Sequence, residues 1–431
     1  MKPAVIGKDG RTTAIRNALL RSPRVEGDVP VLSDGKNFAH PETQQRLLEA
    51  ARDCNPDFVV VGPEEPLKEG VVDSLQKKLG IRCVGPTQNL ARLETSKSYT
   101  RELLSRHGIP GNPRFQIFTG ENAGALERYL ASLDGFVIKP DGLTGGKGVK
   151  VSGSHLKSLR EGLEYAEALL RADRVVIIEE KLDGEEFSLQ SFCDGVNVVH
   201  MPAVQDHKRA WENDEGPNTG GMGSYSDTNH RLPFLAEEHL RAAREINAAV
   251  ARALYRDTGE RYKGILYGGF MVTRDGVRLL EYNARFGDPE ALNVLSILTS
   301  DFAAICAAIL EGSLHPELVD FARLATVCKY VVPSGYPDQP TTGAEISLRD
   351  VPPESARLKH YPASLDTRDG RHYLTGSRAI AFVGIGPTLE DAERIAEEAA
   401  SAVEGPVFHR RDIGTRRLVD ARCRHMSRLL A

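Results

Sequence analysis

The chain has 431 residues, more than one hydrophobic core usually supports, so we expect two to four domains. Its 55 basic and 60 acidic residues give a net charge of −5, which offers no overall electrostatic case for binding nucleic acid or an anionic membrane. Six scattered cysteines, a start unlike a signal peptide and no long apolar run predict a reduced cytoplasmic protein without a zinc site.

The first hundred residues alternate short apolar strands with helical patterns. Strands are expected at 4–7, 58–62 and 81–86, and helices at about 11–20, 71–79 and 94–107. Such alternation is typical of a parallel sheet with helices packed against it. We therefore expect an α/β chain that opens with a Rossmann-like domain at residues 1–108.

The rest of the chain divides into a middle part, residues 109–325, and a β-rich C-terminal part, residues 326–431. Within the middle part, strands at 136–139 and 175–179 belong to a smaller αβ unit at about 113–195, which we expect to act as a mobile lid. A proline-rich passage at 332–337 marks the C-terminal part, and a helix starting near Pro387 closes it.

The most informative pattern lies at the end of an apolar strand expected at 277–283. Glu281 and Asn283 are two positions apart, so on a strand their side chains leave the same face and can share one metal ion or bridge two. Carboxylate and amide oxygens are hard ligands that suit Mg²⁺. Arg285 follows as a candidate partner for phosphate.

A glycine-rich loop at 139–149 follows another strand. Its four glycines let backbone N–H groups approach phosphates, and its two lysines can neutralise them, although the spacing differs from a Walker A loop. The alternative is a hairpin with solvated lysines. Further along, the acidic stretch 179–186 after an apolar strand suits a hinge that reads adenine and ribose, and the alternative there is a solvated turn.

These three patterns, in this order, resemble the ATP-grasp superfamily, in which two αβ lobes clamp ATP and a carboxylate is activated as an acyl phosphate. Within it the chain is similar to the phosphoribosylamine–glycine ligase family of purine biosynthesis. Further segments that carry the similarity are 61–67, 93–97, 205–209 and 216–223. The resemblance implies an ATP-grasp fold with an N-terminal Rossmann-like (pre-ATP-grasp) domain, an ATP-grasp domain at 109–325 and a β-rich C-terminal domain.

The resemblance also implies a role for each matching residue in binding ATP and metal. Lys97, Lys139 and Lys147 would contact the ATP phosphates, the last in the loop with Gly145 and Gly146. Glu180 and Leu182 would frame the adenine, and Glu185 or Glu186 would bind the ribose. Glu281 and Asn283 would hold Mg²⁺ or Mn²⁺.

The resemblance implies two small-molecule substrates, glycine and 5-phosphoribosylamine, as the partners of the protein. The expected substrate-binding residues are Arg11, Glu64, Asp206, His207, Arg209, Asn218, Thr219, Gly220 and Pro289. Lys208, Arg285 and Asp288 are the expected catalytic residues. Arg285 would face the glycine carboxylate or acyl phosphate and Asp288 the ammonium group, and the alternative is an ion pair between them. For His207 we favour contact with the substrate over general-base catalysis, because its neighbours in the sequence are cationic.

The activity implied is ATP-dependent formation of glycyl phosphate, followed by attack of the 5-phosphoribosylamine amine. The turn at 7–14 keeps Arg11 but lacks the Glu and His typical of the family, so an ATP-grasp ligase acting on another amine or amino acid stays an alternative. A non-catalytic ATP-binding regulator is a second alternative.

The C-terminal arginines suggest RNA binding, but interspersed Asp412 and Asp420 favour a solvated helical face. We expect a monomer that binds neither nucleic acid nor membrane. Lys329 and Arg378 either help to close the pocket or lie on the surface.

Overall fold

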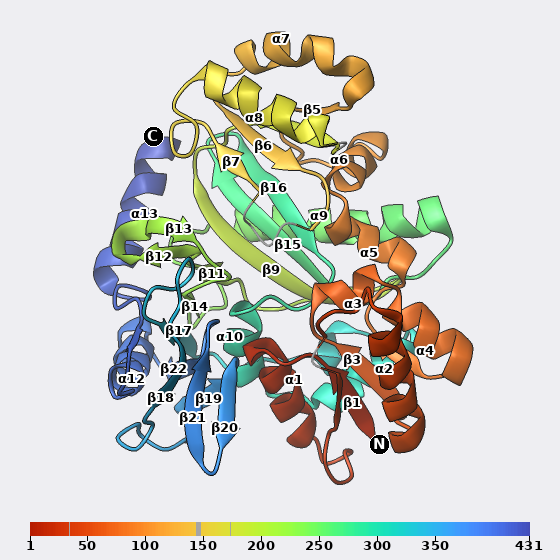
Figure 1. Cartoon of the computed structure of the whole chain (residues 1–431), viewed down its shortest axis with the longest axis vertical. Helices are drawn as coiled ribbons and strands as arrows, with labels where there is room; N and C mark the ends of the chain where they lie inside the picture. Colours follow the sequence, from red (N-terminus) through yellow and green to blue (C-terminus); the bar gives the residue numbers. More distant parts are fainter. Residues whose placement is uncertain (34, 144–147, 173) are drawn as a thin grey trace.

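The computed structural model describes residues 1–33, 35–143, 148–172 and 174–431, and its elements surround one large hydrophobic core (Figure 1). The lid lies at one end of the molecule. At the other end, the N-terminal sheet and the C-terminal sheets lie side by side (Figure 1). The central sheet connects these parts.

The N-terminal sheet is parallel, as predicted, with strand order β2-β1-β3-β4. Its strands are β1 (Pro3–Ile6), β2 (Val31–Ser33), β3 (Phe58–Val61) and β4 (Arg82–Val84), and its helices are α1 (Gly10–Leu20), α2 (Pro41–Cys54), α3 (Glu64–Lys68) and α4 (Val71–Leu79). The single helix expected at 94–107 is wrong. The chain forms α5 (Gln88–Thr95) and α6 (Lys97–Arg106), because Ser96 is extended and its side chain caps α6 by accepting from the Tyr99 N–H.

The lid has its own antiparallel sheet, order β5-β8-β6-β7, and its own small core. The elements are β5 (Phe115–Phe118), η1 (Gly120–Ala125), α7 (Leu126–Ala131), β6 (Phe136–Pro140), β7 (Lys150–Val151), α8 (Leu159–Arg171) and β8 (Val176–Glu180). This core is separate from the main one, and the buried pair of Arg101 with Glu179 joins the lid to α6.

The central sheet is antiparallel, with order β10-β9-β15-β16, and it contains the strand predicted at 277–283. Its strands are β9 (Glu185–Asp194), β10 (Val198–His200), β15 (Lys263–Thr273) and β16 (Gly276–Asn283), and its neighbouring helices are α9 (Glu237–Thr258), α10 (Glu290–Ser296) and α11 (Phe302–Glu311), the last followed by η3 (Pro316–Leu318). The amide of Asn247 on α9 donates to Leu189 O at 3.2 Å, which ties this helix to β9.

A six-stranded sheet joins the middle and C-terminal parts of the chain. It comprises β11 (Gln205–Asp206), β14 (Gly223–Ser226), β17 (Ala325–Pro333), β22 (Ile380–Gly386) and β19 (Leu358–Pro362), with β23 (Val407–Phe408) paired to β17. Smaller pieces are the hairpin of β12 (Arg209–Trp211), η2 (Glu212–Asp214) and β13 (Glu215–Asn218), and the sheet of β18 (Thr342–Ile346), β20 (Leu365–Arg368) and β21 (Arg371–Thr375). Strands on both sides of residue 326 thus share hydrogen bonds, and the domain bounds stay a prediction.

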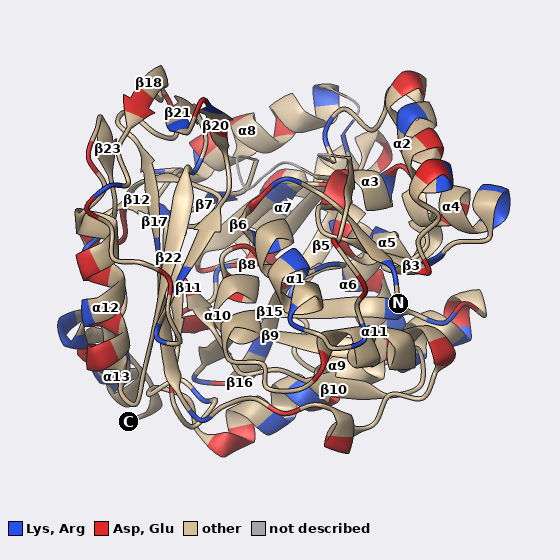
Figure 2. Cartoon of the chain, turned by 90° about the horizontal axis from the view of Figure 1, so that it is seen from below, with Lys and Arg blue, Asp and Glu red and all other residues tan. Residues whose placement is uncertain are grey.

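Two helices complete the C-terminal part. The predicted helix is α12 (Leu389–Ser401), capped by Thr388, and the last is α13 (Arg416–Leu430). Acidic and basic residues are mixed on outer helices such as α2 and α12, which fits the balanced charge of the sequence (Figure 2). In the described ranges, no helix combines the length and apolarity needed to cross a membrane.

Candidate active site

A cavity of about 710 Å³ lies where the N-terminal part, the lid, the central sheet and the C-terminal part meet. Predicted site residues on its wall are Arg11, Glu64, Lys97, Lys139, Glu180, Leu182, Glu186, Asp206, His207, Lys208, Arg209, Asn218, Thr219, Gly220, Glu281, Asn283, Arg285 and Asp288. Pro289 lies just behind this wall. Gly145, Gly146 and Lys147 fall outside the described residues. Residues from distant parts of the sequence therefore share one space.

Lys139 on β6 is held in place by a buried ion-pair network. Its Nζ lies 2.8 Å from Glu179 Oε2 and donates to Leu280 O at 3.2 Å. Glu179 also forms a bidentate pair with Arg101 of α6, at 2.7 and 3.0 Å. Burial would raise the pKa of Glu179, but Arg101 and Lys139 outweigh it and lower that pKa. The network fixes the ammonium of Lys139 at the cavity wall beside β16.

Glu281 and Asn283 leave β16 toward the cavity, as the period of the strand predicted. Burial opposes ionisation of Glu281, yet Lys208, Lys139 and Lys97 keep its pKa below the usual value. The Asn283 Oδ1 accepts from Arg285 Nη2 at 3.2 Å. An ionised carboxylate beside an amide oxygen fits Mg²⁺. Mg²⁺ is usually held by one or two protein ligands together with phosphate and water. In the described ranges no three acidic, His or Cys side chains form a metal-binding group.

The hinge after β8 lies at the other end of the cavity. Glu180 is held by Arg114, whose N–H donates to Oε1 at 2.8 Å and whose Nε lies 3.1 Å from Oε2. Leu182 contributes apolar wall. Glu185 is buried in contacts described below, whereas Glu186 is exposed, so Glu186 is the carboxylate of the two that can reach a ligand.

Lys208 lies among acidic residues of the cavity wall. Its Nζ is 3.8 Å from both Glu186 and Glu281, and nearby carboxylates, Asp206 first, raise the pKa of Lys208 well above normal. Burial raises the pKa of Asp206 to about 7. His207 is buried with neither ring nitrogen hydrogen-bonded, and burial followed by Arg410 lowers its pKa to about 3. His207 is therefore neutral near pH 7.

Arg285 pairs with two glutamates rather than with Asp288. Its Nη2 lies 2.8 Å from Glu94 and its Nε 3.3 Å from Glu64. Burial works against the charged guanidinium, but Glu94 and Glu64 raise its pKa. The Arg285–Asp288 ion pair that the sequence left open is thus replaced by separate partners for each residue.

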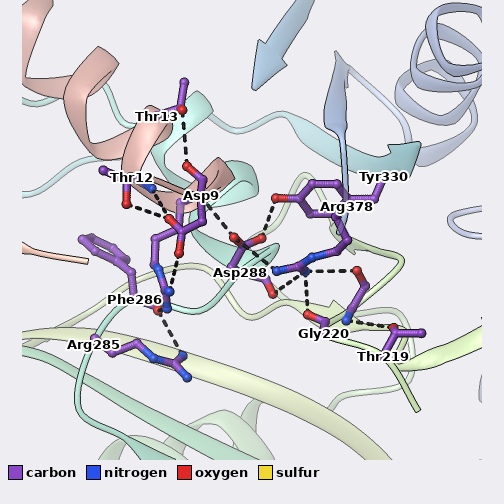
Figure 3. Close-up of polar contacts among 12 residues, drawn as sticks. Asp9, Thr12, Thr13, Thr219, Gly220, Arg285, Phe286, Asp288, Tyr330 and Arg378 are labelled. Carbon is purple, nitrogen blue, oxygen red and sulfur yellow. Dashed lines mark hydrogen bonds and ion pairs between the residues drawn. The ribbon is translucent and has the colours of Figure 1, made fainter. Parts of the chain in front are cut away.

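Asp288 lies in a network centred on Arg378 (Figure 3). Tyr330 donates its hydroxyl to Asp288 Oδ1 at 2.7 Å, and the Arg378 guanidinium lies 3.4 Å from Oδ2. Arg378 also donates to the carbonyls of Gly220, Gly221 and Asp288 at 2.5, 3.1 and 3.1 Å. The glycine-rich loop and Asp288 are thereby fixed to each other by a residue of the C-terminal part.

The same loop packs tightly on Pro289. Gly221 has φ +106°, and a Cβ there would lie 2.7 Å from Pro289 Cδ, so the close approach requires glycine. The Thr219 hydroxyl donates to Lys208 O at 2.8 Å, which helps to hold the loop in this conformation. Pro289 therefore supports the glycine-rich loop from behind.

Arg11 lies at the start of α1 with its guanidinium already engaged. It donates to Phe286 O at 2.8 Å and pairs with Asp9 at 2.5 Å, while its Nε has no hydrogen-bond partner among the described residues. Asp9 also caps α1 by accepting from Thr12 N–H at 2.7 Å, and against the effect of burial its pKa falls to about 2 because of Arg11 and Thr12. A carboxylate of the chain itself thus occupies the helix N-terminus.

The hairpin of β12 and β13 brings Arg209 and Asn218 to the cavity as a cross-strand pair. Arg209 donates to Gly216 O at 2.6 Å, which closes the hairpin. Lys329, in contrast, lies away from the cavity and is fully buried against Glu393 and Glu397 at 2.6 and 2.7 Å. Of the two C-terminal cations considered from the sequence, only Arg378 lines the cavity.

Sequence reasoning missed several residues of the wall, namely Glu94, Arg101, Gln205, Asp214, Glu290 and Arg422. Glu94 and Arg101 carried a usable signal, because each is a charged residue on the apolar face of a helix, where charge requires a partner. Arg422 had no such signal, since the many arginines around it favoured a solvated face.

Comparisons with known proteins agree with this architecture. Family models described as phosphoribosylglycinamide synthetase match residues 1–94 (N domain), 95–291 (ATP-grasp (A) domain) and 326–416 (C domain). Proteins named phosphoribosylamine–glycine ligase from Methanocella arvoryzae and Methanocaldococcus jannaschii are 46% and 44% identical, over 99% and 100% of both chains. A crystal structure of phosphoribosylamine–glycine ligase from Thermotoga maritima has 28% identity and a TM-score of 0.78, and covers 96% of this chain and 100% of its own. Biotin carboxylase from Campylobacter jejuni shares the fold at 14% identity, with a TM-score of 0.70 and coverage of 99% and 95%.

Proposed function

The chain belongs to the phosphoribosylamine–glycine ligase family, and we propose that the cavity described above is where it joins its substrates. It is an ATP-dependent ligase of purine biosynthesis that couples glycine to phosphoribosylamine. The observation that carries the site assignment is the position of Glu281 among Lys97, Lys139 and Lys208, because this arrangement suits a metal–triphosphate group.

ATP would lie with its adenine at Leu182 and the Glu180 backbone, its ribose at Glu186 and its phosphates at Lys97 and Lys139. Mg²⁺, or Mn²⁺ in its place, would be held by Glu281 and Asn283 and would offset charge on the transferring phosphoryl group. Gly145, Gly146 and Lys147 belong to the proposed phosphate loop.

Glycine would bind near Arg285, with its carboxylate oriented for attack on the γ-phosphate. That attack would release ADP and give glycyl phosphate, whose carbonyl carbon the amine of 5-phosphoribosylamine would then attack to give glycinamide ribonucleotide and phosphate. Arg285 and Lys208 would stabilise the negative charge that develops in both steps. Asp288, fixed by Arg378, would orient the ammonium end of glycine, and the lid would exclude water from the acyl phosphate.

The amine substrate would lie between the N-terminal part and the β12–β13 hairpin. Arg11 and Arg209 provide positive charge for its phosphate, and Glu64, Asp206, His207, Asn218, Thr219 and Gly220 provide polar contacts, with Pro289 behind them. The neutral imidazole of His207 lines the cavity with both nitrogens buried and unbonded, so a substrate would reach them after a local rearrangement. We propose that the enzyme works as a monomer in the cytoplasm and needs no nucleic acid or membrane.

The test is ADP release with purified protein, ATP and Mg²⁺, with glycine and phosphoribosylamine supplied together and one at a time. We expect stoichiometric ADP and glycinamide ribonucleotide only when both are present. If another amino acid or amine reacts faster, that compound replaces glycine or phosphoribosylamine as the proposed substrate. ATP binding without turnover under any combination would favour a regulatory protein.

A further inference from the structure

Helix α13 lies almost wholly beyond the matched C-domain model, which ends at residue 416. One face of the helix packs on the main core through Leu418, Val419 and Met426, whereas Arg424 is exposed. Figure 1 shows α13 running beside the β12–β13 hairpin toward the lid. The solvated helical face expected from the sequence is therefore wrong for the inner side of α13, where residues spaced three and four apart meet the body.

Arg422 extends from this inner face to the cavity wall and joins two of its carboxylates. Its Nε lies 3.3 Å from Glu185 Oε2, and its Nη2 donates to Asp214 Oδ2. His425, one turn further on, lies with Nδ1 2.7 Å from Glu185 Oε1 and Nε2 3.4 Å from Asp183. Arg422, Glu185 and Asp214 all line the cavity, so this network belongs to the site wall.

The two carboxylates belong to different structural elements of the proposed site. Glu185 starts β9, next to Glu186 and the hinge proposed to bind adenosine. Asp214 lies in the turn of the β12–β13 hairpin, which carries Arg209 and Asn218.

The chain just before α13 also holds this hairpin. Arg410 donates to Asp214 at 2.9 Å and to Arg209 O at 3.1 Å, and Asp412 accepts from the Asn213 N–H at 2.9 Å. The hairpin is thus fastened to the C-terminal segment at both its turn and its first strand.

We propose that α13 is a positioning element of the ligase, with Arg422 as the positioning residue that sets the spacing between the nucleotide hinge and the substrate hairpin. This inference rests on the proposed function of the cavity. Arg422 holds Glu185 and Asp214 simultaneously, so a movement of either element is transmitted to the other. Glu185 is held by Arg422 and His425 of α13, whereas its neighbour Glu186 is exposed beside Lys208, where a ligand can reach it.

The test compares full-length Arg422→Gln, Arg422→Lys and the exposed control Arg424→Gln. Affinity for a non-hydrolysable ATP analogue with Mg²⁺ is measured by calorimetry, and kcat and KM are measured for ATP and phosphoribosylamine. We expect Arg422→Gln to weaken analogue binding and raise both KM values roughly five- to tenfold, a typical size for coupling between sites. Arg422→Lys should recover part of each loss, and Arg424→Gln should match the unmodified protein.

Trp211 provides a readout that is independent of activity. It is the only tryptophan of the chain, is 56% exposed and lies in the hairpin, with its ring packed on Gly216. In Arg422→Gln the hairpin keeps its contacts with Arg410 and Asp412 but loses the one with Arg422, and this loosening should make Trp211 emission more quenchable by acrylamide. Asp214→Asn, which keeps the Arg422–Glu185 pair, should show the same quenching and a raised KM for phosphoribosylamine, with smaller change in analogue affinity.

Equal analogue affinity and equal quenching in Arg422→Gln and Arg424→Gln would overturn the proposal. So would a loss of thermal stability in Arg422→Gln with unchanged KM values, since that pattern means a purely structural helix. If Arg422→Gln does not fold, Asp214→Asn decides by the same two measurements. Failure of the unmodified protein to ligate glycine to phosphoribosylamine would remove the proposed function, while analogue affinity and quenching would still decide the role of Arg422.

Discussion

Arg101 and Glu179 form a bidentate ion pair in which both side chains are at most 4% exposed, and the pair joins helix α6 to the last strand of the lid. Lys139 shares the same carboxylate at 2.8 Å. One carboxylate therefore compensates two buried cations, and the position of a proposed phosphate-binding lysine depends on it.

Glu179→Gln should be strongly destabilising, because it leaves Arg101 and Lys139 without a compensating charge. Breaking a buried pair typically costs about 3–5 kcal/mol in the free energy of unfolding. Urea denaturation measures the loss. Glu164→Gln, which removes an exposed pair with Arg160, is the control and should cost less than about 0.5 kcal/mol. Equal effects for the two variants would show that the network contributes little.

Glu281→Gln should abolish most turnover without unfolding the protein. The change removes the only ionised side chain proposed to bind the metal and leaves Lys208, Lys139 and Lys97 facing a neutral amide. We expect kcat to fall by at least about a hundredfold and the Mg²⁺ concentration for half-maximal activity to rise. Asp275→Asn, in the exposed turn before β16, is the matched control. A Glu281→Gln enzyme with near-normal rates would remove the metal assignment.

Lys139→Ala should likewise abolish turnover, since it removes a cation proposed to bind the ATP phosphates. Unlike Glu281→Gln, it should also lower stability, because Glu179 keeps only Arg101 as a partner. Thermal unfolding and ADP release, measured on the same preparation, separate the two effects. A folded Lys139→Ala protein with unimpaired ADP release would contradict its role at the phosphates.

Arg378→Lys tests whether the C-terminal part shapes the glycine site. A lysine ammonium cannot reproduce the planar guanidinium that contacts three carbonyls and Asp288 and lies 4.4 Å above the Tyr330 ring. We expect the KM for glycine to rise about tenfold, equivalent to about 1.4 kcal/mol, with a smaller change in the KM for ATP. Arg371→Lys, at an exposed position, should leave both unchanged. A uniform loss across substrates would indicate a general structural defect.

The sequence predicted those parts of the fold in which the local residue pattern matches the element found in the tertiary structure. The parallel N-terminal strands, β16 with Glu281 and Asn283 on one face, and the start of α12 near Pro387 follow from periodicity and capping alone. The break at Ser96 was missed because the apolar pattern continues across it. The roles of Arg378 and Arg422 depend on long-range packing, and a surface arginine and a buried one look alike in sequence.

The neutral state of buried histidines makes the stability of this protein depend on pH. His200 is mostly enclosed, with Nδ1 2.9 Å from the Ser191 hydroxyl, and burial, with a smaller contribution from Arg244, lowers its pKa from 6.5 to about 4. In the unfolded chain this histidine binds a proton below pH 6.5, while the folded protein does not until about pH 4. Its contribution to stability is therefore present above pH 6.5 and is lost as the pH falls toward 4, by about 3 kcal/mol at most.

His200→Gln should remove this part of the pH dependence, since glutamine does not titrate. Urea unfolding at pH 7.5 and at pH 5.0 should show a smaller loss of stability on acidification in His200→Gln than in the unmodified protein. His207, whose pKa is also lowered, keeps its own contribution in both proteins. An identical acid-induced loss in His200→Gln and in the unmodified protein would contradict the lowered pKa of His200.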